Sequence, residues 1–377
     1  MNLIIAGGGT GGHLFPGIAV YERLKSINPD IEVYFIGTEK GIENKLKDDY
    51  DFKFFTINVK GFSGKSLMSK IQSVKELFKA AKEINMIYKA MKPEFVLGLG
   101  GYISFMPLAM AKLKGIRSGV MEQNAVPGLS NKILGLLGIT IFASFEETKK
   151  YLPFSRVTVT GNPVRKKILE MASSRANEIS KGISDGASEG WNKKDFSVFI
   201  FGGSQGASSL NNAAISMLPL LDKGILSSLT VFHQTGDKDY KSVKDFYDNS
   251  GTGRRIKKFE IFPFTKNMEH YYVESDIVIS RSGAGTLSEL IVLRKPAILV
   301  PYPYAVKNHQ EANARVFSKK GCFYIVKDDK NLPKELLQTI SKIFYNRKLL
   351  NNMHNNLRKI DIEDSALKIA GIILGRN

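Results

Sequence analysis

The sequence predicts an α/β protein with two Rossmann-like domains, each a doubly wound parallel sheet, that face one another across a cleft. Short apolar runs rich in Ile, Val, Leu and Phe alternate with segments of helical spacing, which is typical of parallel sheets covered by helices. An apolar run, a glycine-rich turn and a helical segment also follow one another twice, beginning at residues 3 and 196. This repeated opening indicates two similar domains.

The composition agrees with two globular domains. The 377 residues are 43% hydrophobic and 24% charged, which suits two domains of about 150 to 200 residues each. The net charge of +18 indicates affinity for anionic surfaces, although a lysine-rich solvated surface explains it equally well. A single cysteine, Cys322, excludes an internal disulfide. No signal peptide is recognisable, and the longest apolar run (133–143) is shorter than the ~20 residues that cross a bilayer, so we expect a cytoplasmic protein.

The first domain is predicted to span residues 1–163. Helical segments such as Pro16–Ile27 and Pro107–Leu113 separate its apolar runs. Ligands of such sheets bind beyond the carboxyl ends of the strands, where the glycines of this chain lie. The predicted strands are Leu3–Ala6, Ile31–Ile36, Phe52–Ile57, Phe95–Leu99, Ser118–Met121 and Ile139–Ala143.

The second domain is predicted to span residues 164–345. Ser173–Asp195 is rich in Ser, Gly, Lys and Glu and is predicted to form an exposed helix end or loop beside the boundary. Residues 346–377 are expected to be helices that pack back toward the first domain. The predicted strands are Phe196–Phe201, Leu229–His233, Ile256–Phe262, Ile277–Ser280, Ala297–Val300 and Phe323–Val326.

The opening glycine loop, GGGTGGHLFPGIAV from Gly7, is predicted to bind a phosphate. Glycines allow the backbone to approach a ligand, and the start of the following helix favours an anion. Gly7, Gly9 and Gly12 also fit the dinucleotide-binding pattern, with Glu39 as its acidic residue, so an oxidoreductase stays open at this point. A glycine turn can also form without a ligand. Because further glycine turns occur at 98–101 and 202–206, this is a weaker explanation of the glycine loops than phosphate binding.

Two later stretches follow strand ends. In SRSGAGTLSE, which ends at Glu289, the carboxylate can accept both hydroxyls of a ribose, while a capping box of Thr286 and Glu289 is the alternative. In PYPYAVKNHQEAN, the side chains of His309, Gln310 and Asn313 can hydrogen-bond to sugar hydroxyls. Two D-x-D strings, 49–51 and 237–239, are interpreted as solvated turns, and the histidines are scattered, so we expect no metal and no cofactor.

Together these motifs resemble the MurG family, bacterial glycosyltransferases that add N-acetylglucosamine to the undecaprenyl-diphosphate-linked muramyl peptide. The resemblance runs from residue 1 to about residue 320 and implies the GT-B fold. It also implies transfer from UDP-N-acetylglucosamine to the muramyl 4-hydroxyl, which makes lipid II for peptidoglycan. The motifs, in chain order, are GGGTGGHLFPGIAV, GLGGYIS, MEQNAVPGLSN, GNPVR, GGSQGA, RSGAGTLSE and NHQEANA.

The resemblance also implies residue roles. Glu289 matches the acid that holds the ribose, and Phe264 lies in the stretch that lines the uracil. His13, Gly101 and Tyr102 match the side that receives the acceptor's diphosphate. The positions that match UDP-N-acetylglucosamine contacts are Thr10, Gly11, Gly12, Asn124, Arg165, Ser204, Gln205, Phe264, Ala284, Glu289 and Gln310.

The implied reaction is an inverting displacement at the anomeric carbon of the donor sugar. The helix start at 202–207, with Ser204 and Arg165, can receive the charge of the departing UDP without a metal. His13 is the expected base because an imidazole titrates near neutral pH. Glu122 is the rival base, and a third option is that His13 only binds the acceptor's phosphate.

Leu67–Met91 is predicted to be a basic amphipathic helix, with Lys75, Lys79 and Lys82 beside an apolar stripe. Such a helix suits an anionic membrane surface, and the alternative is an ordinary surface helix packed on the sheet. Because the implied acceptor is lipid-linked, we expect a peripheral protein on the cytoplasmic face of the inner membrane.

Three rival functions remain. The first is another GT-B enzyme that uses a UDP-sugar, such as a glycolipid glycosyltransferase or a UDP-N-acetylglucosamine epimerase. The second is a Rossmann oxidoreductase. The third is a nucleic-acid-binding protein, which is disfavoured because the chain lacks interleaved aromatics and basic runs, so no nucleic-acid partner is expected.

Overall fold

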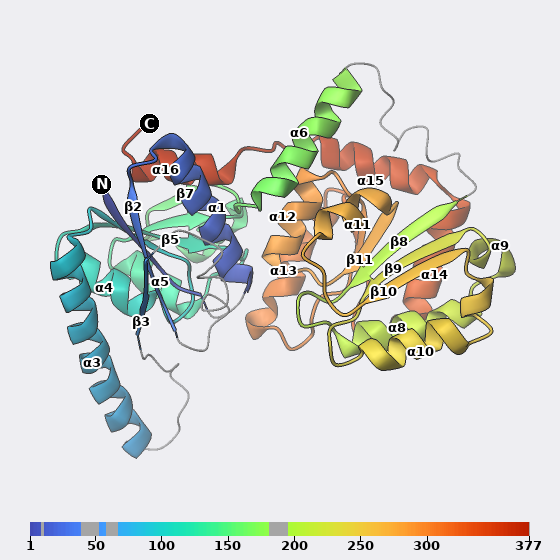
Figure 1. Cartoon of the computed structure of the whole chain (residues 1–377), viewed down its shortest axis with the longest axis horizontal. Coiled ribbons are helices and arrows are strands. Elements are labelled where there is room, and N and C mark those ends of the chain that lie inside the picture. The colour runs from blue at the N-terminus through green and yellow to red at the C-terminus, as the bar shows by residue number, and fades with distance from the viewer. Residues whose placement is uncertain (9–10, 39–52, 58–66, 181–194, 377) are drawn as a thin grey trace. The chain divides into compact units, whose positions relative to one another are not determined.

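The computed structural model describes residues 1–8, 11–38, 53–57, 67–180 and 195–376, and the side chains of 67–78 and 175–180 are outside the description. The chain divides into two compact units (Figure 1). The first unit is Met1–Arg165 together with Glu363–Asn377, and the second is Lys166–Ile362. Among the described residues, no helix is both long and apolar enough to cross a membrane.

The first unit contains a seven-stranded sheet in which every strand pair is parallel. The strand order is β3-β2-β1-β4-β5-β6-β7, so the chain reverses its direction of travel across the sheet between β1 and β4. Such a switch point is where ligands of open α/β sheets bind. The strands are β1 (Asn2–Ala6), β2 (Glu32–Gly37), β3 (Lys53–Thr56), β4 (Phe95–Gly98), β5 (Arg117–Glu122), β6 (Thr140–Ala143) and β7 (Val157–Val159).

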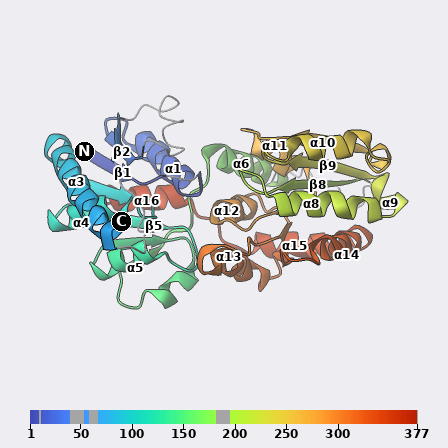
Figure 2. The ribbon, with the colours of Figure 1, turned by 90° about the horizontal axis from the view of Figure 1, so that it is seen from below.

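Helices cover both faces of this sheet. Side chains of β1 alternate, so Leu3 and Ile5 pack under α1 and α16, whereas Ile4 packs under α3, α4 and α5. Both views show α3 beside α4 (Figures 1 and 2). The helices are α1 (Gly11–Ile27), α3 (Leu67–Met91), α4 (Phe105–Leu113), α5 (Leu129–Leu136), the 3-10 helix η1 (Glu146–Tyr151) and α16 (Ser365–Ile373).

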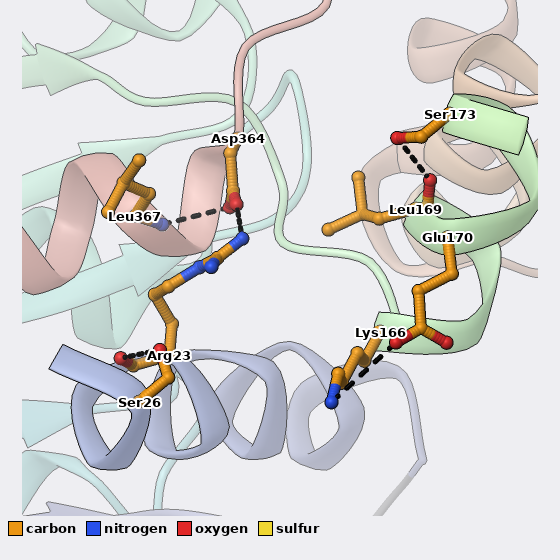
Figure 3. Close-up of polar contacts among 8 residues, drawn as sticks. All are labelled: Arg23, Ser26, Lys166, Leu169, Glu170, Ser173, Asp364 and Leu367. Carbon is orange, nitrogen blue, oxygen red and sulfur yellow. Dashed lines mark hydrogen bonds and ion pairs between the residues drawn. The ribbon is translucent and has the colours of Figure 1, made fainter. Parts of the chain in front are cut away.

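The C-terminal helix α16 completes the core of the first unit. Its residues Ile369 and Ile373 are fully buried in the same cluster as Leu14 of α1. Asp364 caps the helix by accepting the Leu367 backbone N–H at 2.9 Å. The same carboxylate pairs with Arg23 of α1 (Figure 3). The end of the chain is therefore tied to its first helix by apolar packing and by an ion pair.

The second unit repeats this design. Its six strands are all parallel in the order β10-β9-β8-β11-β12-β13, with the switch point between β8 and β11. This confirms the predicted class of two doubly wound α/β domains. The strands are β8 (Phe196–Phe201), β9 (Leu229–Gln234), β10 (Lys258–Phe262), β11 (Ile277–Ser280), β12 (Ala297–Leu299) and β13 (Phe323–Ile325).

The two faces of the second sheet are packed by different groups of side chains. Leu210, Leu336 and Leu350 of α8, α14 and α15 join one buried cluster, whereas Phe199 and Phe201 stack together against Tyr272 of α11. The helices are α6 (Lys166–Ser180), α8 (Ser208–Met217), α9 (Lys223–Leu226), α10 (Tyr240–Asn249), α11 (Met268–Glu274), α12 (Ala284–Val292), α13 (His309–Ser318), α14 (Leu332–Tyr345) and α15 (Lys348–Arg358), with 3-10 helices η2 (Leu218–Leu220), η3 (Gly253–Arg255) and η4 (Val306–Asn308).

Three details differ from the sequence-based expectations. Residues 346–377 do not act as one segment, because α15 belongs to the second unit and α16 to the first. The short edge strand β7 was not predicted, since its three residues carry too little apolar pattern. Helix α1 begins at Gly11 rather than at Pro16, and the proline only removes one hydrogen bond in an early turn.

Candidate active site

Two glycine loops lie at the switch point of the first sheet. Gly7 follows β1 with φ of +143°, and a Cβ built on it would lie 2.7 Å from Leu99 Cβ, so only glycine fits there. Gly100 and Gly101 follow β4 with φ of +92° and +75°. The Ser104 hydroxyl hydrogen-bonds to the carbonyl oxygens of Ala6 and Gly100, which joins the two strand ends. The loops thus form one framework at the carboxyl edge of the sheet.

His13 lies in the first turn of α1 and faces the second glycine loop. A Cβ built on Gly100 would lie 3.4 Å from His13 Nδ1, and one on Gly101 would lie 3.9 Å from Nε2. His13 Nδ1 is 2.9 Å from Oε1 of Gln123, and the Gln123 amide N–H donates to the Leu99 carbonyl at 2.9 Å. The imidazole is half-buried. Its Nδ1 is held by Gln123, and its Nε2 faces Gly101 of the glycine loop.

Glu122, the last residue of β5, is buried and accepts four hydrogen bonds. Its Oε1 accepts the backbone and side-chain N–H groups of Asn124 at 3.0 and 3.4 Å. Its Oε2 accepts the Gly128 backbone N–H at 3.0 Å and the Asn131 amide at 2.8 Å. The carboxylate therefore organises the turn from β5 to α5 and holds Asn124 at the strand end.

The other predicted residues of the first unit lie around this edge. Gly11 and Gly12 open α1, and Tyr102 is 47% exposed beside the second glycine loop. Arg165 is the half-buried last residue of the main segment of the unit. Thr10 and Glu39 lie outside the described residues.

The glycine loop after β8 is the corresponding feature of the second unit. Gly203 and Gly206 have φ of +98° and +75°, and a Cβ on Gly206 would lie 2.0 Å from the Thr235 carbonyl oxygen. Ser204 and Gln205 between them are exposed, and α8 begins just beyond at Ser208. Because the glycines have positive φ and pack closely, the two polar residues between them are exposed near the start of a helix. The start of a helix favours binding of an anion.

Gln234, at the end of β9, connects this loop to the next one. Its amide N–H donates to the Gly203 carbonyl at 3.1 Å, and its Oε1 accepts the Thr265 backbone N–H at 3.2 Å. Phe264, adjacent to Thr265, is 50% exposed. One buried amide thus sets the spacing between the glycine loop and the loop that carries Phe264.

Glu289 lies on α12 and accepts a hydrogen bond from the Tyr272 hydroxyl at 3.0 Å. The helix begins at Ala284 with Gly283 at the N-cap. Thr286 is therefore inside the helix, so the capping-box explanation of Glu289 is wrong.

Gln310 lies at the start of α13 and ties three segments together. Its Oε1 accepts the Tyr302 backbone N–H at 2.9 Å, and its backbone carbonyl accepts the Ser282 hydroxyl at 2.9 Å. Asn313 is fully buried, so it does not offer its amide to a ligand at the surface.

The D-x-D strings divide between described and undescribed parts of the chain. Residues 49–51 lie outside the description, and Asp239 accepts a hydrogen bond from Asn211 at 2.8 Å beside α10. Among the described residues, no group of three or more His, Cys, Asp or Glu side chains is arranged to hold a metal ion.

Sequence reasoning missed three supporting side chains: Gln123, Gln234 and His233. Gln123 and Gln234 each lie at the carboxyl end of a strand. A polar residue at the end of an apolar run was the sequence feature that could have identified them. His233 is fully buried, with Nε2 3.1 Å from Asn211 Oδ1 and Nδ1 3.3 Å from the Tyr247 hydroxyl. Burial lowers the pKa of His233 to about 3, so this imidazole is neutral and structural.

Comparisons with known proteins agree with this arrangement. The glycosyltransferase family 28 N-terminal domain matches residues 3–137, and the C-terminal domain of the same family matches residues 197–367. Two Rossmann-like units with these matches define a glycosyltransferase of the GT-B type.

Curated relatives narrow the family. One from Geotalea daltonii is 36% identical over 100% of this chain and 98% of its own length, and one from Thermodesulfovibrio yellowstonii is 38% identical over 94% of this chain and 92% of its own length. Both are named UDP-N-acetylglucosamine–N-acetylmuramyl-(pentapeptide) pyrophosphoryl-undecaprenol N-acetylglucosamine transferase. The chain belongs to this transferase family, MurG, which confirms the resemblance seen in the sequence motifs.

Solved structures give the same result. The crystal structure of Acinetobacter baumannii MurG is 26% identical and covers 99% of both chains with a TM-score of 0.77. A UDP-GlcNAc 2-epimerase from Neisseria meningitidis has a TM-score of 0.63 at 13% identity, with 100% of both chains covered, and shows a shared fold only. The epimerase alternative is therefore not favoured.

Proposed function

We propose that this chain transfers N-acetylglucosamine from UDP-N-acetylglucosamine to the 4-hydroxyl of the muramyl sugar of undecaprenyl-diphosphate-linked muramyl peptide. The product is lipid II, the lipid-linked disaccharide of peptidoglycan synthesis. The observation that carries the proposal is identity along the whole chain with relatives named for this reaction. The glycine loop at the switch point of each sheet supports it, because each substrate contains a diphosphate.

We assign the donor chiefly to the second unit. Backbone N–H groups of the 202–207 loop, the Ser204 hydroxyl and the Gln205 amide bind the diphosphate. Glu289 accepts the ribose hydroxyls, with Tyr272 holding its carboxylate in place. Phe264 packs on the uracil, and Ala284 and Gln310 complete the binding of the nucleotide sugar. Thr10, Gly11, Gly12, Asn124 and Arg165 are the donor contacts assigned to the first unit.

We assign the acceptor diphosphate to His13, Gly101 and Tyr102, and the base to His13. The acceptor O–H bond breaks, its oxygen bonds to the anomeric carbon, and the proton moves to His13 Nε2. The bond from that carbon to the UDP oxygen breaks, and its electron pair leaves with UDP. Glu122 is the weaker base because four hydrogen bonds already occupy its buried oxygens. Its role is to hold Asn124.

We also propose that the protein works as a peripheral protein on the cytoplasmic face of the membrane that carries the acceptor. Part of the predicted α3 stripe is unavailable to lipid, because Ile84 and Tyr88 are buried against the sheet. The α4–α5 patch is the better contact. It consists of the exposed apolar side chains of Leu113, Leu129, Ile133, Leu136, Leu137, Tyr151 and Phe154.

Lysines accompany the α4–α5 patch. Lys132 Nζ lies 5.5 Å from the centre of the Tyr151 ring, and Lys112 Nζ lies 3.2 Å from a Cβ built on Gly138. Apolar side chains that enter the head-group region, together with cations that meet anionic lipid, are the two components of interfacial binding.

Transfer of radiolabelled sugar to a lipid-linked muramyl acceptor tests the function. We expect transfer from UDP-N-acetylglucosamine but little from UDP-glucose or UDP-galactose, and no loss of rate with excess chelator. The His13→Ala variant should lose about 10²- to 10⁴-fold in kcat while calorimetry shows unchanged donor binding. Absence of transfer by the wild-type protein, or a requirement for a divalent ion, would contradict the proposal.

A further inference from the structure

A buried amide connects the proposed base to the sheet. Gln123 directly follows β5 and is 2% exposed. Its two polar atoms are both engaged, Oε1 with His13 Nδ1 and Nε2 with the Leu99 carbonyl, each at 2.9 Å. The three groups come from α1, the end of β5 and the end of β4, which are adjacent at the switch point.

The Leu99 carbonyl determines which way the amide points. A backbone carbonyl oxygen only accepts hydrogen bonds, so the Gln123 atom that faces it is the nitrogen. A flipped amide would bring two acceptor oxygens together with no proton between them. Gln123 Oε1 therefore faces His13, and because an amide oxygen also only accepts, Nδ1 of His13 carries the proton.

We propose that Gln123 is the positioning residue that keeps neutral His13 in the Nδ1–H tautomer, with the lone pair on Nε2. This inference rests on the proposed function, in which Nε2 takes the proton of the incoming hydroxyl. A Cβ built on Gly101 would lie 3.9 Å from Nε2, so the lone pair faces a residue without a side chain. The acceptor hydroxyl can approach Nε2 from that side.

The neutrality of glutamine matters for the reaction. An amide selects the tautomer without adding charge, whereas a carboxylate at this place would favour the protonated imidazolium, which cannot act as a base. Among the described residues, Glu122 and Tyr102 are titratable side chains of the strand end and the glycine loop that adjoin His13. Glu122 is turned toward Asn124 and Asn131, and Tyr102 is 47% exposed in the glycine loop.

Nitrogen-15 NMR of the full chain, at a pH where imidazoles are neutral, measures the tautomer directly. The His13 signals are identified by their loss in His13→Asn. We expect protonated Nδ1 and unprotonated Nε2 in the wild-type protein. In Gln123→Met, which keeps the length of the side chain but removes both hydrogen bonds, Nε2–H should become populated. The kcat should fall about tenfold or more, with the KM for UDP-N-acetylglucosamine within about twofold.

Gln338→Met is the matched control, because Gln338 is an exposed glutamine on α14. It should leave the tautomer and kcat unchanged. If Gln123→Met retains the Nδ1–H tautomer or the wild-type kcat, Gln123 does not position His13.

Gln123→Glu decides the question if Gln123→Met does not fold, as judged by circular dichroism. It keeps an acceptor for Nδ1–H, so the tautomer should persist while the acid limb of the rate–pH profile moves to higher pH. An unmoved acid limb, or a shift to Nε2–H, would overturn the inference.

The NMR measurement needs no substrate, so the role of Gln123 and the proposed sugar transfer can be tested independently. A wild-type protein with the expected tautomer but no sugar transfer would contradict the proposed function alone. An active wild-type protein with its proton on Nε2 would contradict the role of Gln123 and the assignment of Nε2 as the base, but not the transfer of the sugar.

Discussion

His13 and His233 are the same residue type at the carboxyl edges of the two sheets, and their surroundings give them opposite properties. His13 is half-buried, with one nitrogen held by Gln123 and the other beside a glycine. His233 is fully buried, and both of its nitrogens have partners within the protein. A sequence pattern identifies a histidine, but only its neighbours decide whether it is available for proton transfer.

The pKa of His233 predicts a pH dependence of stability. Its folded pKa of about 3 lies below its unfolded value near 6.5, so below pH 6.5 only the unfolded chain binds the proton. Stability from this group is complete above that pH and decreases as pH falls. The wild-type free energy of unfolding should drop by about 1.4 kcal/mol more than that of His233→Gln between about pH 7.5 and about pH 5.5.

Urea denaturation at several pH values measures this difference. His309→Gln is the control, because it replaces another histidine by the same residue at a position that is only partly buried. A His233→Gln variant with the wild-type slope would show that folding does not lower the pKa of His233.

Glu122 should affect stability more than an ordinary acid does. Glu122→Ala leaves buried N–H groups of Asn124, Gly128 and Asn131 without their acceptor, which should cost about 3 kcal/mol or more. Glu146→Ala is the control, since its carboxylate is exposed and pairs with Lys149 at 2.7 Å. That variant should stay within about 0.5 kcal/mol of wild type by urea denaturation. Equal stabilities of the two variants would contradict the structural role of Glu122.

At the scale of elements, the candidate site residues lie at the ends of strands and helices, and polar side chains set the spacing between these ends. Gln234 joins the loop after β8 to the loop after β10, and Ser104 joins the ends of β1 and β4. The C-terminal helix α16 contributes to packing rather than to the candidate site. It comes from the far end of the chain and completes the core beside α1.

The attachment of α16 depends on Asp364. Asp364→Ala removes both the helix cap and the pairing with Arg23, which should destabilise the first unit by about 1 to 2 kcal/mol. Its neighbour provides the control, because Glu363 is exposed and pairs only at the surface with Lys368. Glu363→Ala should show the wild-type thermal midpoint. A similar midpoint for both variants would mean that apolar packing alone holds α16.

At the scale of the whole molecule, the chain joins two similar units with different surfaces. The α4–α5 patch belongs to the first unit, and lysines accompany it. In the proposed membrane contact, the net charge of +18 would draw the protein toward anionic lipid, and the α4–α5 patch would determine which face meets the membrane.

Vesicle sedimentation tests this orientation. Lys132→Glu combined with Leu136→Gln should weaken binding to vesicles containing phosphatidylglycerol by about tenfold or more. The control combines Lys223→Glu with Leu220→Gln in the second unit, where Leu220 is 65% exposed against 67% for Leu136. The control makes the same change of charge and apolar surface, so equal loss in both variants would show that only net charge matters.

Most of the fold was predictable because its signals are local. Apolar runs predicted twelve of the thirteen strands in the described part of the chain to within a few residues, and α3 has its predicted bounds. The division of the tail between the two units was not predictable, because the pattern of a helix shows which of its faces is apolar but not which sheet that face will cover. Which sheet α15 and α16 each cover depends on contacts with residues far away in the chain.

The sequence by itself determined the two parallel sheets, the glycine loops at their edges and the membership of a transferase family. Those features depend on periodicity, turns and motif order, which can be recognised from residues close together in the sequence. Only the tertiary structure decided that Glu122 is fully hydrogen-bonded and that His13 is held by an amide 110 residues away. The physical reason is that the hydrogen-bond partners of a side chain are set by which strand ends come together, and strand order brings distant parts of the chain into contact.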